Sequence, residues 1–245
     1  MSDWKKRLGA GGLTLLALIL AAVGRPSDPA PERDVLGEAK IPAGPYVALT
    51  FDDGPRQATT SVLLDGLAQR GVHATFFVIG ENVEGNELLL QRMEGEGHQI
   101  GLHTYHHKPL DQLNAAGFYA EVDSLRATLT ALLGREEFML RPPYGMMNAA
   151  NQARAAAPII LWSVDPEDWS DRNTARQVSA ITADVKDGDI ILLHDIYAES
   201  VDTALQVVDA LMAQGYHFVT VEQLFAIRGR TPENGKIYRR LPPGD

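Results

Sequence analysis

The chain has 245 residues, of which 45% are hydrophobic, and it contains no cysteine. This composition is typical of a globular protein with one α/β domain of ordinary size. A formal net charge of −10 argues against nucleic-acid binding, because phosphate recognition needs a basic face. Without cysteine there are no disulfides and no thiolate ligands, so any metal site must use His, Asp and Glu.

A targeting segment is predicted at the N-terminus. Lys5, Lys6 and Arg7 precede an uncharged run rich in Leu and Ala, residues 8–24. A basic flank followed by an apolar run is typical of a signal peptide or a membrane anchor whose basic end stays inside. The run is at the short limit for a membrane-spanning helix. We favour an uncleaved anchor over a cleaved signal, and both place the rest of the chain outside the cytoplasm.

Three further segments follow residues 1–24. Residues 25–40 contain three prolines among mixed charges between positions 25 and 33, which predicts a linker. A catalytic domain is expected over residues 41–230, and a C-terminal tail over residues 231–245.

Within the domain, apolar strand-like runs alternate with helix-like stretches. Strands are expected at residues 47–51, 74–79, 99–102, 138–140, 159–162, 190–193 and 218–221. Helices are expected at residues 60–69, 86–96 and 114–133, and between the later strands. This alternation indicates parallel βαβ units, and seven of them suggest an α/β barrel, complete or incomplete.

Polar residues follow these strands directly. They are Asp52, Asp53, His103, Arg141, Asp165 and His194. In α/β barrels the active site collects at the carboxyl ends of the strands. We therefore expect these scattered residues to converge on one face of the barrel.

The acidic pair and the two histidines predict a metal site. In Asp52-Asp53-Gly54-Pro55, one carboxylate can bind a cation while its neighbour serves as base, although Asp-Gly-Pro is also ordinary turn chemistry. His103 and His107 are four residues apart and share a face on a helical turn. Two imidazoles and one carboxylate form a facial metal site, whereas two histidines at this spacing without the carboxylate are more often a surface pair.

The later motifs supply candidates for the remaining roles. Arg141 can pair with a carboxylate, either for catalysis or as a structural ion pair. The prolines after it stiffen the loop, so the Tyr144 N–H suits an oxyanion hole. Asp165 can orient a histidine, and His194 is a candidate general acid or a buried core histidine.

Together, in this order, these blocks resemble the polysaccharide deacetylases of carbohydrate esterase family 4, the NodB-homology domain. The resemblance runs from Val47 to about Phe225. It implies a distorted (β/α)7 barrel and a bound metal, usually Zn²⁺ or another divalent ion such as Co²⁺. One departure is His106, where members of the family often carry Asn, Asp or Ser.

The resemblance also implies roles for individual residues. The metal ligands would be Asp53, His103 and His107. Asp52 would be the catalytic base, oriented by Arg141, with the Tyr144 backbone as oxyanion donor. His194 would be the catalytic acid, tuned by Asp165. The substrate-binding residues would be Trp169, Leu192 and Pro142, the first two forming the walls of the acetyl pocket.

The function implied is removal of N-acetyl groups from a polysaccharide that contains N-acetylglucosamine, first of all peptidoglycan and then chitin-like oligomers. The alternatives are an O-acetyl esterase of the acetylxylan type and a catalytically inactive wall-binding domain. We expect a monomer outside the cytoplasm that contacts the membrane through its N-terminal segment and binds no nucleic acid.

Overall fold

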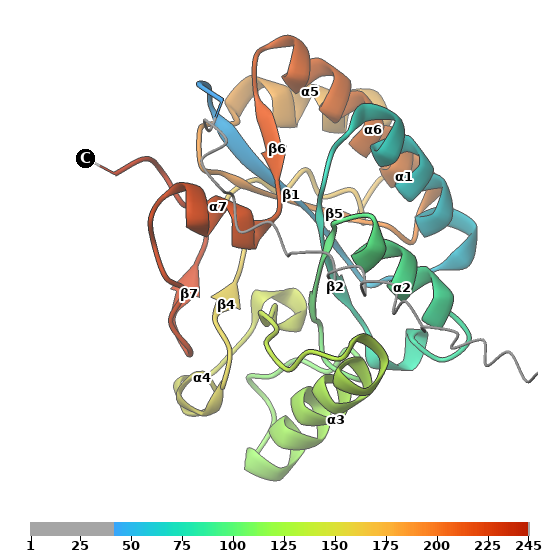
Figure 1. The fold of residues 1–245 in the computed structure, drawn as a ribbon. Coiled ribbons are helices and arrows are strands. Elements are labelled where there is room, and N and C mark those ends of the chain that lie inside the picture. Colours follow the sequence, from blue (N-terminus) through green and yellow to red (C-terminus); the bar gives the residue numbers. More distant parts are fainter. Residues whose placement is uncertain (1–41, 245) are drawn as a thin grey trace, which may run out of the picture. The chain divides into compact units, whose positions relative to one another are not determined.

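The computed structural model describes residues 42–244 (Figure 1), so the predicted targeting segment (1–24) and linker (25–40) lie outside the described residues. The strands are β1 (Tyr46–Asp52), β2 (Thr75–Val78), β3 (Gln99–Leu102), β4 (Ile159–Ile160), β5 (Ile190–His194), β6 (His217–Val219) and β7 (Ile237–Tyr238). The α-helices are α1 (Gln57–Arg70), α2 (Glu87–Gly95), α3 (Ala115–Leu133), α4 (Ala149–Arg154), α5 (Thr174–Asp184), α6 (Ala198–Ala213) and α7 (Val221–Ile227). None of the helices in this part of the chain has the length and apolar character needed to cross a membrane.

The strands form a parallel sheet that curls toward a ring. Its continuous part has the order β3-β2-β1-β5, and β6 pairs with the first half of β1. Single bridges continue the ring, because Leu140 pairs with both Leu102 and Ile159, and Val164 pairs with Ile191. The strand expected at residues 138–140 is thus reduced to one bridge at Leu140. The predicted α/β fold with a distorted barrel of parallel strands is confirmed.

Burial explains why β1 shows no alternation of polar and apolar residues. All seven of its residues are buried, as expected for a parallel strand covered on both faces. Val47, Leu49 and Phe51 belong to the core cluster that includes the surrounding helices, whereas Tyr46 and Ala48 belong to the second cluster. Side chains on a strand alternate between its two faces, so β1 joins both halves of the core.

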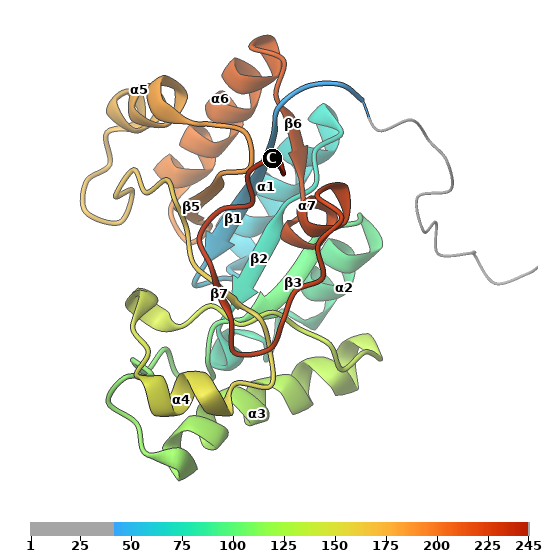
Figure 2. The same cartoon turned by 90° about the vertical axis from the view of Figure 1, so that its left-hand side faces the viewer.

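The helices surround the sheet, and neighbouring helices pack on one another around it. α5 packs on α6, α6 on α1, α1 on α2, and α2 on α3, and α3 and α4 lie side by side below the strands in both Figure 1 and Figure 2. The last predicted strand ends at Val219 because Thr220 caps α7 through a reciprocal hydrogen-bond pair with Gln223.

The C-terminal segment, for which a tail is predicted at residues 231–245, packs against the domain over its described residues. β7 pairs in parallel with β4, and Leu241 is fully buried in the second core cluster. The Leu241 carbonyl lies so close to Gly188 that a side chain at position 188 would collide with it. A polar, glycine- and proline-containing sequence resembles a tail, but its few apolar residues cover the end of the barrel.

Candidate active site

The carboxyl ends of the strands bring the predicted residues together. Asp52 is the last residue of β1 and His194 the last of β5, and the two lie opposite each other in the strand pairing. His103 directly follows β3, and Arg141 directly follows the bridge at Leu140. The convergence arises because all these strands are parallel and end at the same side of the sheet.

Three of these side chains form a compact group of potential metal ligands. Asp53, His103 and His107 each offer one ligand atom, and these atoms lie within 4.8 Å of one another. The Nε2 atoms of His103 and His107 lie 3.4 Å and 3.2 Å from Asp53 Oδ1. His103 Nδ1 donates to the Arg141 carbonyl at 2.8 Å, which leaves its Nε2 lone pair free to face Asp53.

The chemistry of this group fits a divalent cation. Asp53 Oδ1 is buried and has no hydrogen-bond partner among the described residues. Burial would raise the pKa of Asp53, but the close approach and charge of His103, with the charges of His107 and His194, lower it to about 2. Burial and the neighbouring His103 lower the pKa of His107, which favours the neutral imidazole that metals bind. Three convergent electron-pair donors of this kind are the usual protein ligands of zinc.

Asp52 is held as a buried ion pair. Its side chain is 4% exposed, and its Oδ1 accepts a 2.8 Å hydrogen bond from Arg141. Arg141 is fully buried and also donates to the Thr50 hydroxyl and to two backbone carbonyls. Removing one partner of such a buried pair costs about 3–5 kcal/mol because the other charge is left uncompensated. Asp52 therefore has a fixed orientation toward His103, whose Nε2 lies 3.6 Å from Asp52 Oδ2.

His194 is paired with Asp168, a residue that the sequence analysis did not select. Its Nδ1 lies 2.8 Å from Asp168 Oδ1, and its backbone N–H donates to Asp168 Oδ2 at 2.9 Å. Burial would lower the pKa of His194, but the hydrogen bond and charge of Asp168, helped by Asp52 and Asp53, raise it to about 9. The imidazole is thus held in the protonated form at neutral pH, with Nε2–H available as a donor.

Asp165 is the residue predicted to tune His194, but the carboxylate that hydrogen-bonds to the imidazole is that of Asp168. Asp165 is exposed, and its Oδ1 accepts from the Glu167 N–H at 2.8 Å in a local turn. Glu167 has a left-handed φ of 56°, and this turn directs the fully buried Asp168 back toward β5. The sequence feature that could have identified Asp168 is its position directly before Trp169, a residue already predicted to bind substrate.

The remaining predicted residues flank this centre. Tyr144 has a left-handed φ of 59°, and its ring packs edge-on against His107 at 4.8 Å. Trp169 is 55% exposed, as expected for a wall open to a ligand. Leu192 is buried two residues before His194, on the same face of β5. Pro142 is buried between Arg141 and the turn that contains Tyr144.

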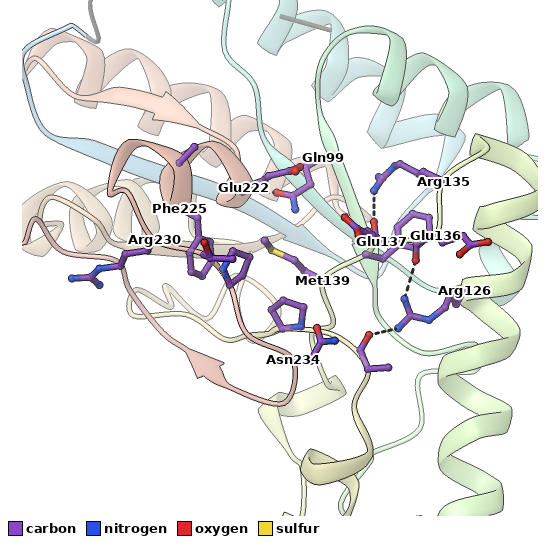
Figure 3. Close-up of a pocket in the computed structure, with 16 residues that line it drawn as sticks. Gln99, Arg126, Arg135, Glu136, Glu137, Met139, Glu222, Phe225, Arg230 and Asn234 are labelled. Carbon is purple, nitrogen blue, oxygen red and sulfur yellow. Dashed lines mark hydrogen bonds between the residues drawn. The ribbon is translucent and has the colours of Figure 1, made fainter. Parts of the chain in front are cut away.

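Two cavities differ in their relation to this centre. One, of about 660 Å³, is lined by Asp53 and His107 together with polar residues such as Arg56 and Asn86, and extends the site as a groove. The other, of about 530 Å³, lies at the amino ends of the strands, beside the first residue of β3 (Figure 3). Its Arg126 and Arg135 donate to backbone carbonyls of the neighbouring loop, so they hold that loop.

The comparisons with known sequences agree with this geometry. Residues 39–158 match the family model for polysaccharide deacetylases. The peptidoglycan-N-acetylmuramic acid deacetylase PdaC of Bacillus subtilis (strain 168) is 38% identical over 191 residues. The peptidoglycan-N-acetylglucosamine deacetylase PgdA of Listeria monocytogenes (serotype 1/2a, strain 10403S) is 39% identical over 195 residues. Each match covers 78% of this chain but 41% of the relative, so the chain spans about two fifths of their length.

Solved structures give the same result. The T48 deacetylase, solved with substrate, is 42% identical with a TM-score of 0.76, covering 80% of this chain and 96% of that chain. A family 4 acetyl xylan esterase from Clostridium thermocellum, in complex with a cobalt ion, is 27% identical with a TM-score of 0.76, covering 80% and 99%. The sequence match, the fold and the arrangement of the site together show that this chain belongs to the polysaccharide deacetylase family.

Proposed function

We propose that this chain is a metal-dependent hydrolase that removes acetyl groups from the N-acetylglucosamine residues of peptidoglycan. The proposal rests on the buried Asp53 Oδ1, which lies 3.2 Å from His107 Nε2 and 3.4 Å from His103 Nε2. The candidate base Asp52 and the candidate acid His194 lie at the paired ends of the neighbouring strands β1 and β5. Similar proteins named as peptidoglycan deacetylases support the substrate class.

We propose that Asp53, His103 and His107 hold the metal, and that the ion is zinc. The chemistry that a divalent ion supplies when bound is that of a Lewis acid, which polarises a carbonyl oxygen and acidifies water. Cobalt is an alternative, because the similar esterase from Clostridium thermocellum was solved with that ion. Both ions accept the same imidazole and carboxylate ligands.

The proposed proton transfers use the two flanking pairs. Asp52, fixed by Arg141 at 2.8 Å, takes the proton from the attacking water. His194, kept protonated by Asp168, gives its Nε2 proton to the amine as the sugar departs. The Tyr144 N–H stabilises the oxyanion that develops on the acetyl carbonyl.

Substrate contacts are assigned to the residues around this centre. Trp169 and Leu192 form the walls of the acetyl pocket, and Pro142 fixes the loop beside it. The groove of about 660 Å³ next to Asp53 and His107 receives the adjoining sugars. All of these residues belong to one chain, so a monomer is sufficient.

The second candidate is O-acetyl esterase activity on xylan. The acetyl pocket and the oxyanion donor would serve an ester as well as an amide, and the similar acetyl xylan esterase favours this alternative. The two reactions differ in the leaving group, since an amine needs a proton far more than an alcohol does. A catalytically inactive wall-binding domain is the third candidate, and the presence of base, acid and three ligand side chains argues against it.

The deciding experiment measures acetate release from peptidoglycan, chitin oligomers and acetylxylan, each with and without a chelator. We expect the highest kcat/KM on peptidoglycan and loss of activity on chelation, with recovery when zinc is returned. Release from acetylxylan alone would select the esterase. Acetate release that survives complete metal removal contradicts the metal-dependent mechanism, and no release from any polymer selects the binding domain.

We propose further that the domain acts outside the cytoplasm, tethered by residues 8–24, because peptidoglycan lies there and the basic flank precedes an apolar run. Protease added to intact spheroplasts should then remove the domain. Digestion only after lysis contradicts this placement, and a soluble secreted product selects a cleaved signal peptide.

A further inference from the structure

The loop that carries two of the proposed metal ligands has an unusual backbone. Thr104 and His107 have φ values of 65° and 55°, in the left-handed region that residues other than glycine rarely adopt. Such conformations persist only where the surrounding structure fixes them. The orientation of His107 therefore depends on the contacts that anchor this loop.

The first half of the loop is anchored by backbone hydrogen bonds. The His103 N–H donates to the Val78 carbonyl at 3.0 Å, which continues the pairing with β2. The Gly80 N–H donates to the Thr104 carbonyl at 3.0 Å, and the Glu81 N–H donates to the Tyr105 carbonyl at 2.9 Å. These anchors end two residues before His107, so they do not fix its imidazole.

The second half of the loop is held by Glu121 on α3. Its Oε2 accepts from the His106 N–H at 2.8 Å, and its Oε1 lies 3.0 Å from His106 Nδ1. The same Oε1 forms a 2.9 Å ion pair with Lys108 Nζ. Glu121 thus binds the residues immediately before and after His107.

Burial makes these contacts specific. The Glu121 side chain is 2% exposed, and a buried carboxylate is strongly disfavoured unless it is paired and hydrogen-bonded. Among the described residues, the hydrogen-bond and ion-pair partners of the Glu121 side chain all lie in this one loop. The His106 ring is half exposed and its Nδ1 is occupied by Glu121, so this departure from the family pattern supports the loop and lies outside the group of metal ligands.

We propose that Glu121 is a positioning residue of the metal centre, which sets the affinity for the ion by clamping His106 and Lys108 on either side of His107. The inference rests on the proposed metal site. Loss of a residue that orients a metal ligand typically lowers metal affinity or activity by about 10–100-fold.

The test is the zinc dissociation constant of the full chain, measured by competition with a chromogenic chelator. We expect Glu121→Ala to raise it by about 10–100-fold. Glu121→Gln keeps an acceptor for the His106 N–H but loses the charge that pairs with Lys108, so it should lie between Glu121→Ala and the wild type. Asp123→Asn, an exposed acid on the same helix, is the matched control and should bind zinc like the wild type.

Two further readouts separate positioning from general stability. At saturating zinc the kcat of Glu121→Gln should return close to the wild-type value, because Asp52 and His194 are untouched. The thermal midpoint of the metal-free protein reports the structural contribution. If Glu121→Gln and any folded Glu121→Ala bind zinc with wild-type affinity, or lose kcat that saturating zinc does not restore, the proposal is wrong. A wild-type chain that binds no zinc rejects the metal centre itself, and this role falls with it.

Discussion

Asp52→Asn is expected to lower kcat by ~10²–10⁴-fold while the zinc content of the purified protein stays unchanged. The substitution keeps the size of the side chain and one acceptor oxygen for Arg141, but it removes the base that takes the proton from water. Asp52 is the last residue of β1 and is fixed by a 2.8 Å contact to Arg141. Steady-state acetate release and metal analysis of the same preparation measure both quantities.

The neighbouring carboxylate provides the control for this prediction. Asp53 Oδ1 lies within 3.4 Å of both His103 Nε2 and His107 Nε2, so Asp53→Asn should lose zinc first and activity as a consequence. Added zinc should partly restore Asp53→Asn and leave Asp52→Asn unchanged. If both variants show the same zinc content and the same rate, the division of labour between base and ligand is wrong.

The convergence of the site could be predicted from the sequence because it follows from strand direction. Asp52, His103, Arg141 and His194 each come directly after an apolar run, and parallel strands place their carboxyl ends together. That prediction needs only the order of the elements. It does not depend on the conformation of any loop.

The partners that orient these residues depend on loop geometry and could not be read in the same way. Asp165 and Asp168 are both acids after the same strand, and the left-handed turn at Glu167 decides which of them reaches His194. Glu121 lies in the middle of a long helix, where a charged residue ordinarily faces water. Its burial arises from the path of the loop that contains His106.

The second prediction with a large effect concerns the general acid His194. Substrates that differ in their leaving group test this role directly. His194→Ala should lower kcat on an N-acetyl sugar by ~10²–10⁴-fold, because an amine leaves poorly without a proton. An activated aryl acetate needs little protonation of its leaving group. On that substrate His194→Ala should be much milder than Asp52→Asn, since water must still be activated. Equal damage on both substrates would mean that His194 has a structural role.

The pH profile gives a second test of the same residue. The raised pKa of His194, about 9, keeps the acid protonated below that pH, so activity should fall as the pH rises through the basic limb. A divalent ion beside Asp53 offsets part of the negative charge near His194, so the informative quantity is the shift between variants measured with the same metal. Asp168→Asn removes the hydrogen-bonded charge and leaves the burial that lowers the pKa, so its basic limb should move to lower pH. Asp165→Asn changes an exposed carboxylate outside this hydrogen bond, so its basic limb should move much less. If Asp165→Asn moves the limb further than Asp168→Asn, the carboxylate that tunes the acid has been misassigned.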